Sequence, residues 1–270
     1  MRPLNLVFSI LSVLITAFLV DALSHTLQVL QAIAVVVTIA GASNILNDIF
    51  DINIDKKNQP NRPLPSGEIS VLSAIIYMFF IYTLGIYIAF NLPPLAIKIA
   101  LLFVLPTMLL YTPLFKPLPL IGNAVIGLVL GMVFLFSEAA FTGKINIMWI
   151  PAWLAFGLSF IRELIKDIAD IEGDKINGAI TFPVKFGIDS SLYLTYGLII
   201  LFCSLCWIPY LNYNYGKLYA ITLLFTVEIP LILSIFFMRK NPTSSGCAII
   251  SRVTKWITFG GMVTILCSSL

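Results

Sequence analysis

Acidic and amide side chains recur at helical spacing in one short stretch of this chain. Asn47, Asp51 and Asp55 are each separated by four residues, and Asp48 lies three residues before Asp51. On a helix these spacings place the side chains along one face, over roughly 12 Å. Carboxylate and amide oxygens suit Mg²⁺, which proteins bind with a few carboxylates, waters and substrate phosphates. The spacing therefore predicts a site for magnesium and a phosphate group.

Basic and polar residues surround this first acidic motif. Lys56 and Lys57 follow Asp55 at once, and Arg62 comes shortly after them. We expect Arg62 to make a two-pronged contact with phosphate oxygens, and Asn44 to add a substrate contact at the start of the stretch. The alternative is a solvated helix end of mixed charge. It is the weaker reading, because a chain this apolar places few charges anywhere.

A second acidic motif lies about 120 residues later in the chain. Asp167, Asp170 and Asp174 are spaced three and four residues apart, which again describes one helical face. We expect the neighbouring basic residues to contact substrate: Arg162, Lys166 and Lys175. An alternative for the first two is a structural ion pair with Glu163 at membrane depth. Two acidic motifs with basic residues beside them fit a diphosphate bridged by Mg²⁺ ions.

The composition indicates the kind of chain that must position these motifs. Of its 270 residues, 59% are hydrophobic and 11% charged, and the mean hydropathy is +1.00. Soluble domains carry about 25% charged residues, so we expect a polytopic membrane protein. The net charge of +3 argues against nucleic-acid binding, and the single histidine, His25, excludes a histidine-rich metal site. Cys203 and Cys206 lie in an apolar segment and are interpreted as buried apolar residues.

Apolar runs of about 20 residues predict an all-α bundle of about nine transmembrane helices. The first run, after Arg2, is interpreted as a retained span and not as a cleaved signal. Because the acidic motifs end the second and sixth spans, we expect one domain, 1–270, of two similar four-helix halves plus a ninth helix. The predicted spans are 4–22, 27–50, 69–91, 94–112, 118–141, 147–168, 190–210, 217–238 and 248–267.

Lysine and arginine placement predicts the orientation in the cell membrane. With the N-terminus in the cytoplasm and the C-terminus outside, both charged loops, 51–68 and 168–189, are cytoplasmic. The opposite side then receives only Lys98, Lys144 and Lys217. Both acidic motifs thus reach the cytoplasmic face. Glu138 is expected near the far interface, in reach of water, and Glu228 deeper within its span; neither has an assigned role.

Together these motifs resemble those of the UbiA-type intramembrane prenyltransferases, over essentially the whole chain. The resemblance implies a helical bundle around a central cavity, in which the aspartates of both motifs bind Mg²⁺ and the diphosphate of an isoprenyl donor. The residues that carry it are Asn47-Asp48-x-x-Asp51-x-x-x-Asp55, Asn58-x-Pro60-x-Arg62-Pro63-Leu64-Pro65-Ser66-Gly67 and Asp167-x-x-Asp170-x-x-x-Asp174.

The family also implies further substrate contacts. Its members place a tyrosine and a lysine on the diphosphate where this chain has Tyr111 and Lys116. The alternative is an interfacial tyrosine and a positive-inside lysine. Asn123, at the start of the fifth span, and Asn5, in the first, can face the cavity. By this resemblance, the catalytic residues are Asp48, Asp51, Asp55, Asp167, Asp170 and Asp174, and the metal ligands are these six with Asn47.

Some residues narrow the resemblance to members that prenylate a lipid acceptor. They are Arg2-Pro3-Leu4-Asn5, the run from Arg162 to Asp167, and Gly173-Asp174 with Thr181-Phe182-Pro183, where similar sequences usually have Thr-Leu-Pro. They imply transfer of a geranylgeranyl group to the sn-2 hydroxyl of geranylgeranylglyceryl phosphate in ether-lipid synthesis. The alternatives are an aromatic or chlorophyllide-type acceptor and, outside enzymes, a cation transporter. Expected partners are the donor, the lipid acceptor and membrane lipids; the sequence names no protein partner.

Overall fold

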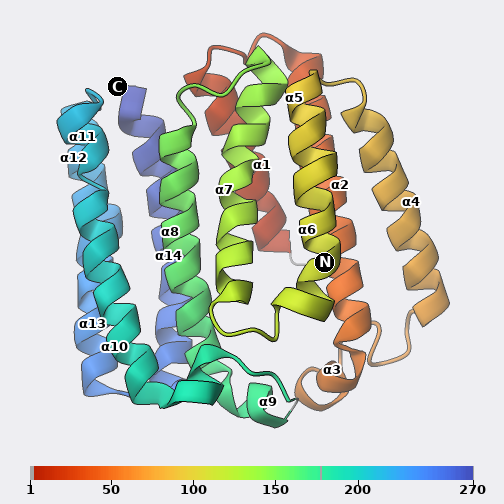
Figure 1. Cartoon of the computed structure of the whole chain (residues 1–270), viewed down its shortest axis with the longest axis vertical. Helices are drawn as coiled ribbons and strands as arrows, with labels where there is room; N and C mark the ends of the chain where they lie inside the picture. The colour runs from red at the N-terminus through yellow and green to blue at the C-terminus, as the bar shows by residue number, and fades with distance from the viewer. Residues whose placement is uncertain (1–2, 177, 270) are drawn as a thin grey trace. The chain divides into compact units, whose positions relative to one another are not determined.

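The computed structural model describes residues 3–176 and 178–269, and every regular element in those ranges is a helix (Figure 1). Seven helices in the described ranges are long and apolar enough to cross a membrane. The all-α membrane fold expected from the sequence is thereby confirmed. These seven spans are Thr26–Phe50, Val71–Ala89, Pro94–Phe115, Ile121–Thr142, Phe182–Asn212, Lys217–Lys240 and Ser244–Leu266.

Helices α1 (Pro3–Leu19) and α8 (Trp149–Ala169) correspond to the remaining two predicted spans. With 17 residues, α1 is at the short end of the length that crosses a bilayer. Helix α8 has 21 residues, but its last turns hold several charged side chains, beginning with Arg162 and Glu163. Each of the nine predicted spans therefore corresponds to a helix in the described ranges. Of these two, α1 is short for a membrane span, and the last turns of α8 are charged.

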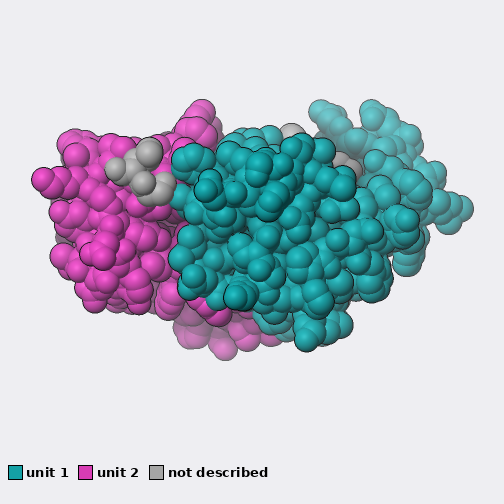
Figure 2. Space-filling view, turned by 90° about the horizontal axis from the view of Figure 1, so that it is seen from above, with its two compact units in different colours: residues 1–115, 132–148 teal, residues 116–131, 149–270 magenta. Residues whose placement is uncertain are grey.

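The chain divides into two compact units, coloured separately in Figure 2. Unit 1 comprises residues 1–115 and 132–148, and unit 2 comprises residues 116–131 and 149–270. The boundary after Phe115 follows the fourth predicted span. Helix α7 (Ile121–Thr142) is divided between the units. The division into two four-helix halves plus a ninth helix therefore stays a prediction.

In unit 1, α2 (Thr26–Phe50) packs against α1 and α4 (Val71–Ala89). The hydroxyls of Ser43 and Tyr82 are hydrogen-bonded at 3.0 Å across the α2–α4 contact. Helix α4 begins where the Ser70 side chain accepts a hydrogen bond from the Ser73 N–H, which satisfies one free donor of the first turn. These contacts fix α2, the helix that leads into the first acidic motif.

In unit 2, α8 packs against α14 (Ser244–Leu266) and α10 (Phe182–Leu205). The first half of α7 lies very close to α8. A Cβ atom at Gly127 would lie 2.9 Å from the Phe156 carbonyl oxygen, and one at Gly131 would lie 2.6 Å from that of Ala152. The Gly127-x-x-x-Gly131 pattern thus works as a close helix-packing motif. Helix α8 is held between neighbours and carries the second acidic motif at its end.

Two spans contain three described π-helical segments, each at or just before a proline. They are η1 (Lys98–Val104), η2 (Tyr111–Phe115) and η3 (Leu224–Glu228). Proline has no N–H and clashes with the carbonyl of the preceding turn, so the regular hydrogen-bond ladder cannot continue through it. The prolines are Pro106, Pro113 and Pro230, and the flanking helices are α5 (Pro94–Ile97), α6 (Leu105–Leu110), α12 (Lys217–Leu223) and α13 (Ile229–Lys240).

The predicted start of the seventh span was wrong. Helix α10 begins at Phe182, not at residue 190, and Gly187 interrupts it with a φ of +85°. Both long loops contain a short helix, α3 (Ile52–Asn58) in the first and α9 (Ile171–Ile176) in the second. The chain is completed by α11 (Ile208–Asn212) and η4 (Cys267–Ser269).

Candidate active site

The first acidic motif spans the junction between α2 and α3, where Asp51 is the single residue between the helices. The N–H of Asp51 donates to the Asn47 carbonyl at 2.9 Å, and the N–H of Asp55 donates to the Asp51 carbonyl at 2.8 Å. The helical hydrogen-bond pattern therefore continues across the junction. As the spacing predicted, Asn47, Asp51 and Asp55 follow one another at successive turns.

Asn47 connects this motif to the π-helical turn η2. Its side-chain N–H donates to Asp51 Oδ2 at 3.0 Å, while its carbonyl oxygen accepts from the Thr112 hydroxyl at 3.3 Å. The sequence did not predict this role for Thr112. Its position next to Tyr111, a predicted substrate contact, was the one feature that pointed to it. Through Thr112, the segment that begins at Tyr111 is brought to the first motif.

Arg62 folds back onto the carboxylates of the first motif. Its Nη1 lies 2.6 Å from Asp55 Oδ2 and 3.7 Å from Asp48 Oδ1. The turn before Arg62 is closed by a hydrogen bond of 3.1 Å from the Arg62 N–H to the Gln59 carbonyl. A second turn follows, in which the Ser66 N–H donates to the Arg62 carbonyl and Gly67 has a φ of +82°, which favours glycine. The guanidinium thus reduces repulsion between two acids that lie near each other.

The second acidic motif has the same backbone design. Asp170 is the single residue between α8 and α9; its N–H donates to the Lys166 carbonyl at 2.9 Å, and the Asp174 N–H donates to the Asp170 carbonyl at 2.9 Å. Gly173 lies inside α9, so the helical turn continues past it to Ile176. The single helical face predicted for these aspartates is therefore formed.

Two side chains hold the carboxylates of the second motif. The Asn123 side-chain N–H donates to Asp167 Oδ2 at 2.6 Å, and the Thr181 hydroxyl donates to Asp174 Oδ2 at 3.1 Å. Burial raises the pKa of Asp174, and the hydrogen bond from Thr181 opposes that rise. Asn123 was predicted as a cavity residue, whereas the contact of Thr181 was not expected.

Lys116 belongs with the second motif. Burial raises the pKa of Asp174, and the positive charge of Lys116 is one of the smaller effects that oppose this rise. The turn that holds Lys116 is tied to the same region by a hydrogen bond of 3.2 Å from the Ile180 N–H to the Pro117 carbonyl. The structure thus brings together Lys116 and Asp174, which are far apart in sequence. Both belong to unit 2, whereas Tyr111 belongs to unit 1.

Glu163 is buried and pairs with two of the predicted substrate-binding residues. Its carboxylate lies 2.9 Å from Arg162 Nη1 and 3.3 Å from Lys166 Nζ. The structural ion pair weighed for these residues is therefore present. Three predicted substrate contacts have no described side-chain bond to either motif. Asn44 is half-buried one turn before Asp48, Asn5 is half-buried in α1, and Lys175 is exposed on α9.

The donor atoms of both motifs suit Mg²⁺ in kind. They are carboxylate and amide oxygens, the hard ligands that this ion prefers. Within the described ranges, no three histidine, cysteine or acidic side chains gather closely enough to hold a metal ion. Mg²⁺ usually binds one or two carboxylates and completes its shell with waters and phosphates, so each motif fits a partial ligand set of that kind.

Glu138 and Glu228 lie outside both motifs. Glu138 was expected to reach water, but that expectation was wrong, because its side chain is only 2% exposed. It accepts hydrogen bonds from the N–H groups of Asn146, Ile147 and Met148 at 2.9, 2.9 and 3.1 Å. Glu138 therefore ties the end of α7 to segment 146–148, which follows it.

The chain is similar to archaeal relatives along most of its length. It is 34% identical to a digeranylgeranylglyceryl phosphate synthase of Natronomonas pharaonis over 83% of this chain and 80% of the relative. It is 30% identical to the synthase of that name from Methanobrevibacter smithii, over 98% and 93% of the two chains.

Solved structures show the same fold. One solved structure comes from work on digeranylgeranylglyceryl phosphate synthase in membranes. Its sequence is 30% identical to this chain and its TM-score is 0.78, over 98% of this chain and 92% of the other. A UbiA homologue from Archaeoglobus fulgidus bound to DMAPP and Mg²⁺ has 20% identity and a TM-score of 0.70, over 97% of each chain. The model of the UbiA prenyltransferase family matches residues 6–253. The two acidic motifs share one backbone hydrogen-bond pattern, and the family model covers most of the sequence. The chain therefore belongs to the UbiA prenyltransferase family.

Proposed function

We propose that this chain is a membrane prenyltransferase that moves a geranylgeranyl group from geranylgeranyl diphosphate to the sn-2 hydroxyl of geranylgeranylglyceryl phosphate. The observation that carries the proposal is the pair of acidic motifs, each built across a helix junction with the same hydrogen-bond pattern. The names of relatives matched along most of the chain support the choice of acceptor.

In this proposal the two motifs act on one donor diphosphate. Bound Mg²⁺ supplies positive charge that makes diphosphate a better leaving group. Arg62 and Lys116 add positive charge beside the motifs, and Tyr111 adds a hydroxyl donor. The seven residues proposed to hold the metal are Asn47, Asp48, Asp51, Asp55, Asp167, Asp170 and Asp174.

The chemistry follows from the electron demand of the allylic carbon. When its C–O bond to diphosphate breaks, the bonding electrons leave with diphosphate and the prenyl group becomes an allylic cation. The acceptor hydroxyl oxygen then forms the new C–O bond, and its proton passes to the released diphosphate. Because a cation needs only a weak nucleophile, no strong general base is required, and we assign none.

The remaining predicted residues are proposed to position the substrates. Glu163 holds Arg162 and Lys166 at the second motif, where their charges can meet substrate phosphate. Asn123 orients Asp167, and Asn44, Asn5 and Lys175 are proposed as further substrate contacts.

The orientation is also a proposal. We infer that the N-terminus and both acidic motifs face the cytoplasm and that the C-terminus lies outside. The distribution of lysine and arginine supports it, because cytoplasmic loops of membrane proteins are enriched in these residues.

Product identity tests the proposal directly. The purified protein is incubated with labelled geranylgeranyl diphosphate, Mg²⁺ and either geranylgeranylglyceryl phosphate or 4-hydroxybenzoate. We expect a labelled diether with the first acceptor and no product with the second. An aromatic product without the diether would overturn the choice of acceptor, and no product with either would favour the non-enzyme alternative, a cation transporter.

Two variants test the residues. Asp51→Asn and Asp170→Asn should each lower kcat/KM about 100-fold or more, since each removes one charged oxygen ligand. Asp189→Asn is the matched control, because Asp189 is exposed on α10. Unchanged transfer in both motif variants contradicts the proposed site.

A further inference from the structure

Three charged residues of α8 form a cluster just before the second acidic motif. The Glu163 carboxylate contacts a cation through each of its oxygens: Arg162 Nη1 lies 2.9 Å from Oε1, and Lys166 Nζ lies 3.3 Å from Oε2. The side chains of Arg162 and Glu163 are only 15% and 11% exposed. Charged groups at membrane depth face a polar cavity or each other. By itself, the cluster combines two positive charges with one negative charge, which suits the binding of an anion.

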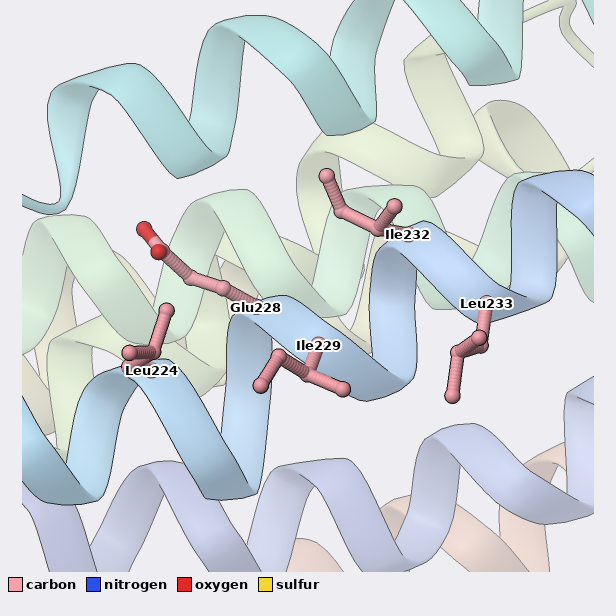
Figure 3. Close-up of a pocket in the computed structure, with 5 residues that line it drawn as sticks. All are labelled: Leu224, Glu228, Ile229, Ile232 and Leu233. Atoms are coloured by element: carbon pink, nitrogen blue, oxygen red, sulfur yellow. The ribbon is translucent and has the colours of Figure 1, made fainter.

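A buried acid in unit 2 does not by itself require such a cluster. Glu228 is also buried, but the pocket at which it lies, shown in Figure 3, is lined by aliphatic side chains: Leu224, Ile229, Ile232 and Leu233. Arg162 and Lys166 are four residues apart and lie on one face of α8. Both have long side chains with many rotamers. The two contacts of Glu163 therefore hold both cations in place.

The cluster lies at a defined distance from the second motif. Along the helix, Arg162 precedes Asp167 by five residues and Asp170 by eight. At about 1.5 Å per residue, these separations are roughly 7.5 Å and 12 Å. Lys166 is nearer, and its positive charge acts on both Asp167 and Asp174. Lys166 thus belongs with the motif, whereas Arg162 lies one to two turns farther into the span.

The proposed acceptor brings its own phosphate close to the reacting atoms. Its sn-2 hydroxyl oxygen and its phosphorus atom are separated by four bonds, which limits their distance to about 5 Å. The hydroxyl must approach the allylic carbon to about 3–3.5 Å, and that carbon is bonded to the donor diphosphate. The acceptor phosphorus therefore lies within about 8 Å of the allylic carbon. The separation between Arg162 and the second motif matches this distance.

An arginine suits the acceptor phosphate. This phosphate does not leave during the reaction, so it needs recognition and no activation by a metal. A phosphate monoester carries about −1.5 to −2 charges at neutral pH, and a guanidinium can bind it through two parallel N–H bonds. The guanidinium has five N–H donors, and the described contact with Glu163 is made by Nη1. Arg162 can therefore keep its contact with Glu163 while it binds phosphate.

We propose that Arg162 binds the phosphate of the acceptor lipid and that Glu163 positions its guanidinium for this contact. The inference rests on the proposed function and adds which substrate the cluster recognises. A lipid alcohol or a phenol without a phosphate offers no partner to Arg162, although its hydroxyl could attack the same cation. The cluster thus selects the acceptor, while the acidic motifs bind the donor.

Equilibrium binding separates the two substrates. The purified protein in nanodiscs is titrated calorimetrically with geranylgeranylglyceryl phosphate in EDTA without donor, and separately with geranylgeranyl diphosphate and Mg²⁺. Arg162→Gln should weaken acceptor binding about 10- to 100-fold, as expected for lost hydrogen bonds to a charged group, and change donor binding by less than about threefold. Arg162→Lys should recover part of the acceptor affinity, because it keeps the charge but not the two-pronged contact.

Acceptor discrimination is a second readout, which an ion pair that only stabilises α8 would not change. We compare kcat/KM for geranylgeranylglyceryl phosphate with that for geranylgeranylglycerol, which keeps the sn-2 hydroxyl and lacks the phosphate. Wild type should prefer the phosphate form by about tenfold or more. Arg162→Gln should lose most of this preference through a higher KM for the phosphate form, with the donor KM unchanged. Arg252→Gln is the control and should match wild type, because Arg252 is exposed on α14 and bonded to the Ala248 carbonyl.

A double variant keeps the test valid if Arg162→Gln does not fold. Arg162→Gln combined with Glu163→Gln removes both charges of one ion pair and should show the same loss of acceptor binding. In whichever variant folds, unchanged acceptor binding, or an equal loss of donor and acceptor binding, would overturn the inference alone. So would a wild type that uses both acceptors equally well. A wild type that transfers the prenyl group to neither would overturn the proposed function, and this inference with it.

Discussion

At the scale of single residues, each acidic motif is completed by a partner that follows its last aspartate by seven residues. Arg62 bonds Asp55, and Thr181 bonds Asp174. Asp51 and Asp170 occupy the equivalent helix junctions. The two motifs therefore share a backbone design but differ in electrostatics, since a charged donor serves the first and a neutral hydroxyl the second.

Asn123 is predicted to position Asp167 for metal binding. Asn123→Leu removes the 2.6 Å hydrogen bond to Asp167 and leaves that carboxylate without its orienting donor. Residues that orient metal ligands typically contribute about 10- to 100-fold to affinity or activity. We therefore expect a higher Mg²⁺ concentration for half-maximal transfer, measured by titration of activity. Asn212→Leu, at an exposed site, should leave the titration unchanged; an unchanged titration in Asn123→Leu would refute the role.

Glu138 is predicted to stabilise the fold without affecting chemistry. Glu138→Ala leaves three backbone N–H groups without their acceptor. The N–H of Met148 is buried, and a buried group left without a partner costs about 1–3 kcal/mol. The temperature of thermal unfolding should fall by several degrees, while kcat per folded molecule at low temperature stays near wild type. Glu68→Ala, at an exposed position, serves as the control. Equal unfolding temperatures for the two variants would contradict this account.

At the scale of elements, the glycines of α7 allow a contact that larger residues would prevent. The close approach of Gly127 and Gly131 to α8 supports the helix that carries Arg162, Glu163 and the second motif. Glycine is costly in the middle of a helix by about 1 kcal/mol relative to alanine. Its presence in α7 is therefore explained by packing and not by helix propensity.

Two glycine-to-alanine changes test this explanation. Gly131→Ala places a methyl group against the Ala152 carbonyl oxygen and should lower the unfolding temperature. Gly197→Ala, in α10, meets nothing within 4 Å and should be neutral or stabilising by up to about 1 kcal/mol. Thermal unfolding in detergent measures both. The same shift in both variants would argue that helix propensity, and not packing, decides the outcome.

At the scale of the whole molecule, charge is concentrated in two loops of an apolar chain. Both loops lie on the same side in the proposed topology, which is necessary if one diphosphate is to meet both motifs. The lysine and arginine distribution predicts which side this is.

Cysteine labelling tests the topology. In a background without Cys203, Cys206, Cys247 and Cys267, a single cysteine replaces either Ser66 or Lys144, both exposed. In intact cells, a membrane-impermeant maleimide should label Lys144→Cys, whereas Ser66→Cys should react only after permeabilisation. The opposite pattern would reverse the proposed orientation.

The sequence by itself determined the spans and the spacing within each acidic motif. Both depend on local rules: the length of an apolar run and the periodicity of a helix. The same rules placed Asn47, Asp51 and Asp55 at successive turns. They failed at the start of α10, which begins at Phe182 and not at residue 190. Proline is tolerated in the first turn of a helix, and Gly187 adopts a positive φ.

Only the tertiary structure decided which distant groups meet. Thr112 reaches Asn47 across 65 positions of sequence, and Asn123 reaches Asp167 across 44. The burial of Glu138 and Glu228 was likewise invisible, because a lone acid in an apolar run looks the same whether it faces water, backbone N–H groups or a pocket. Such contacts depend on how helices pack, and packing is set by surfaces from the whole fold and not by any one stretch of sequence.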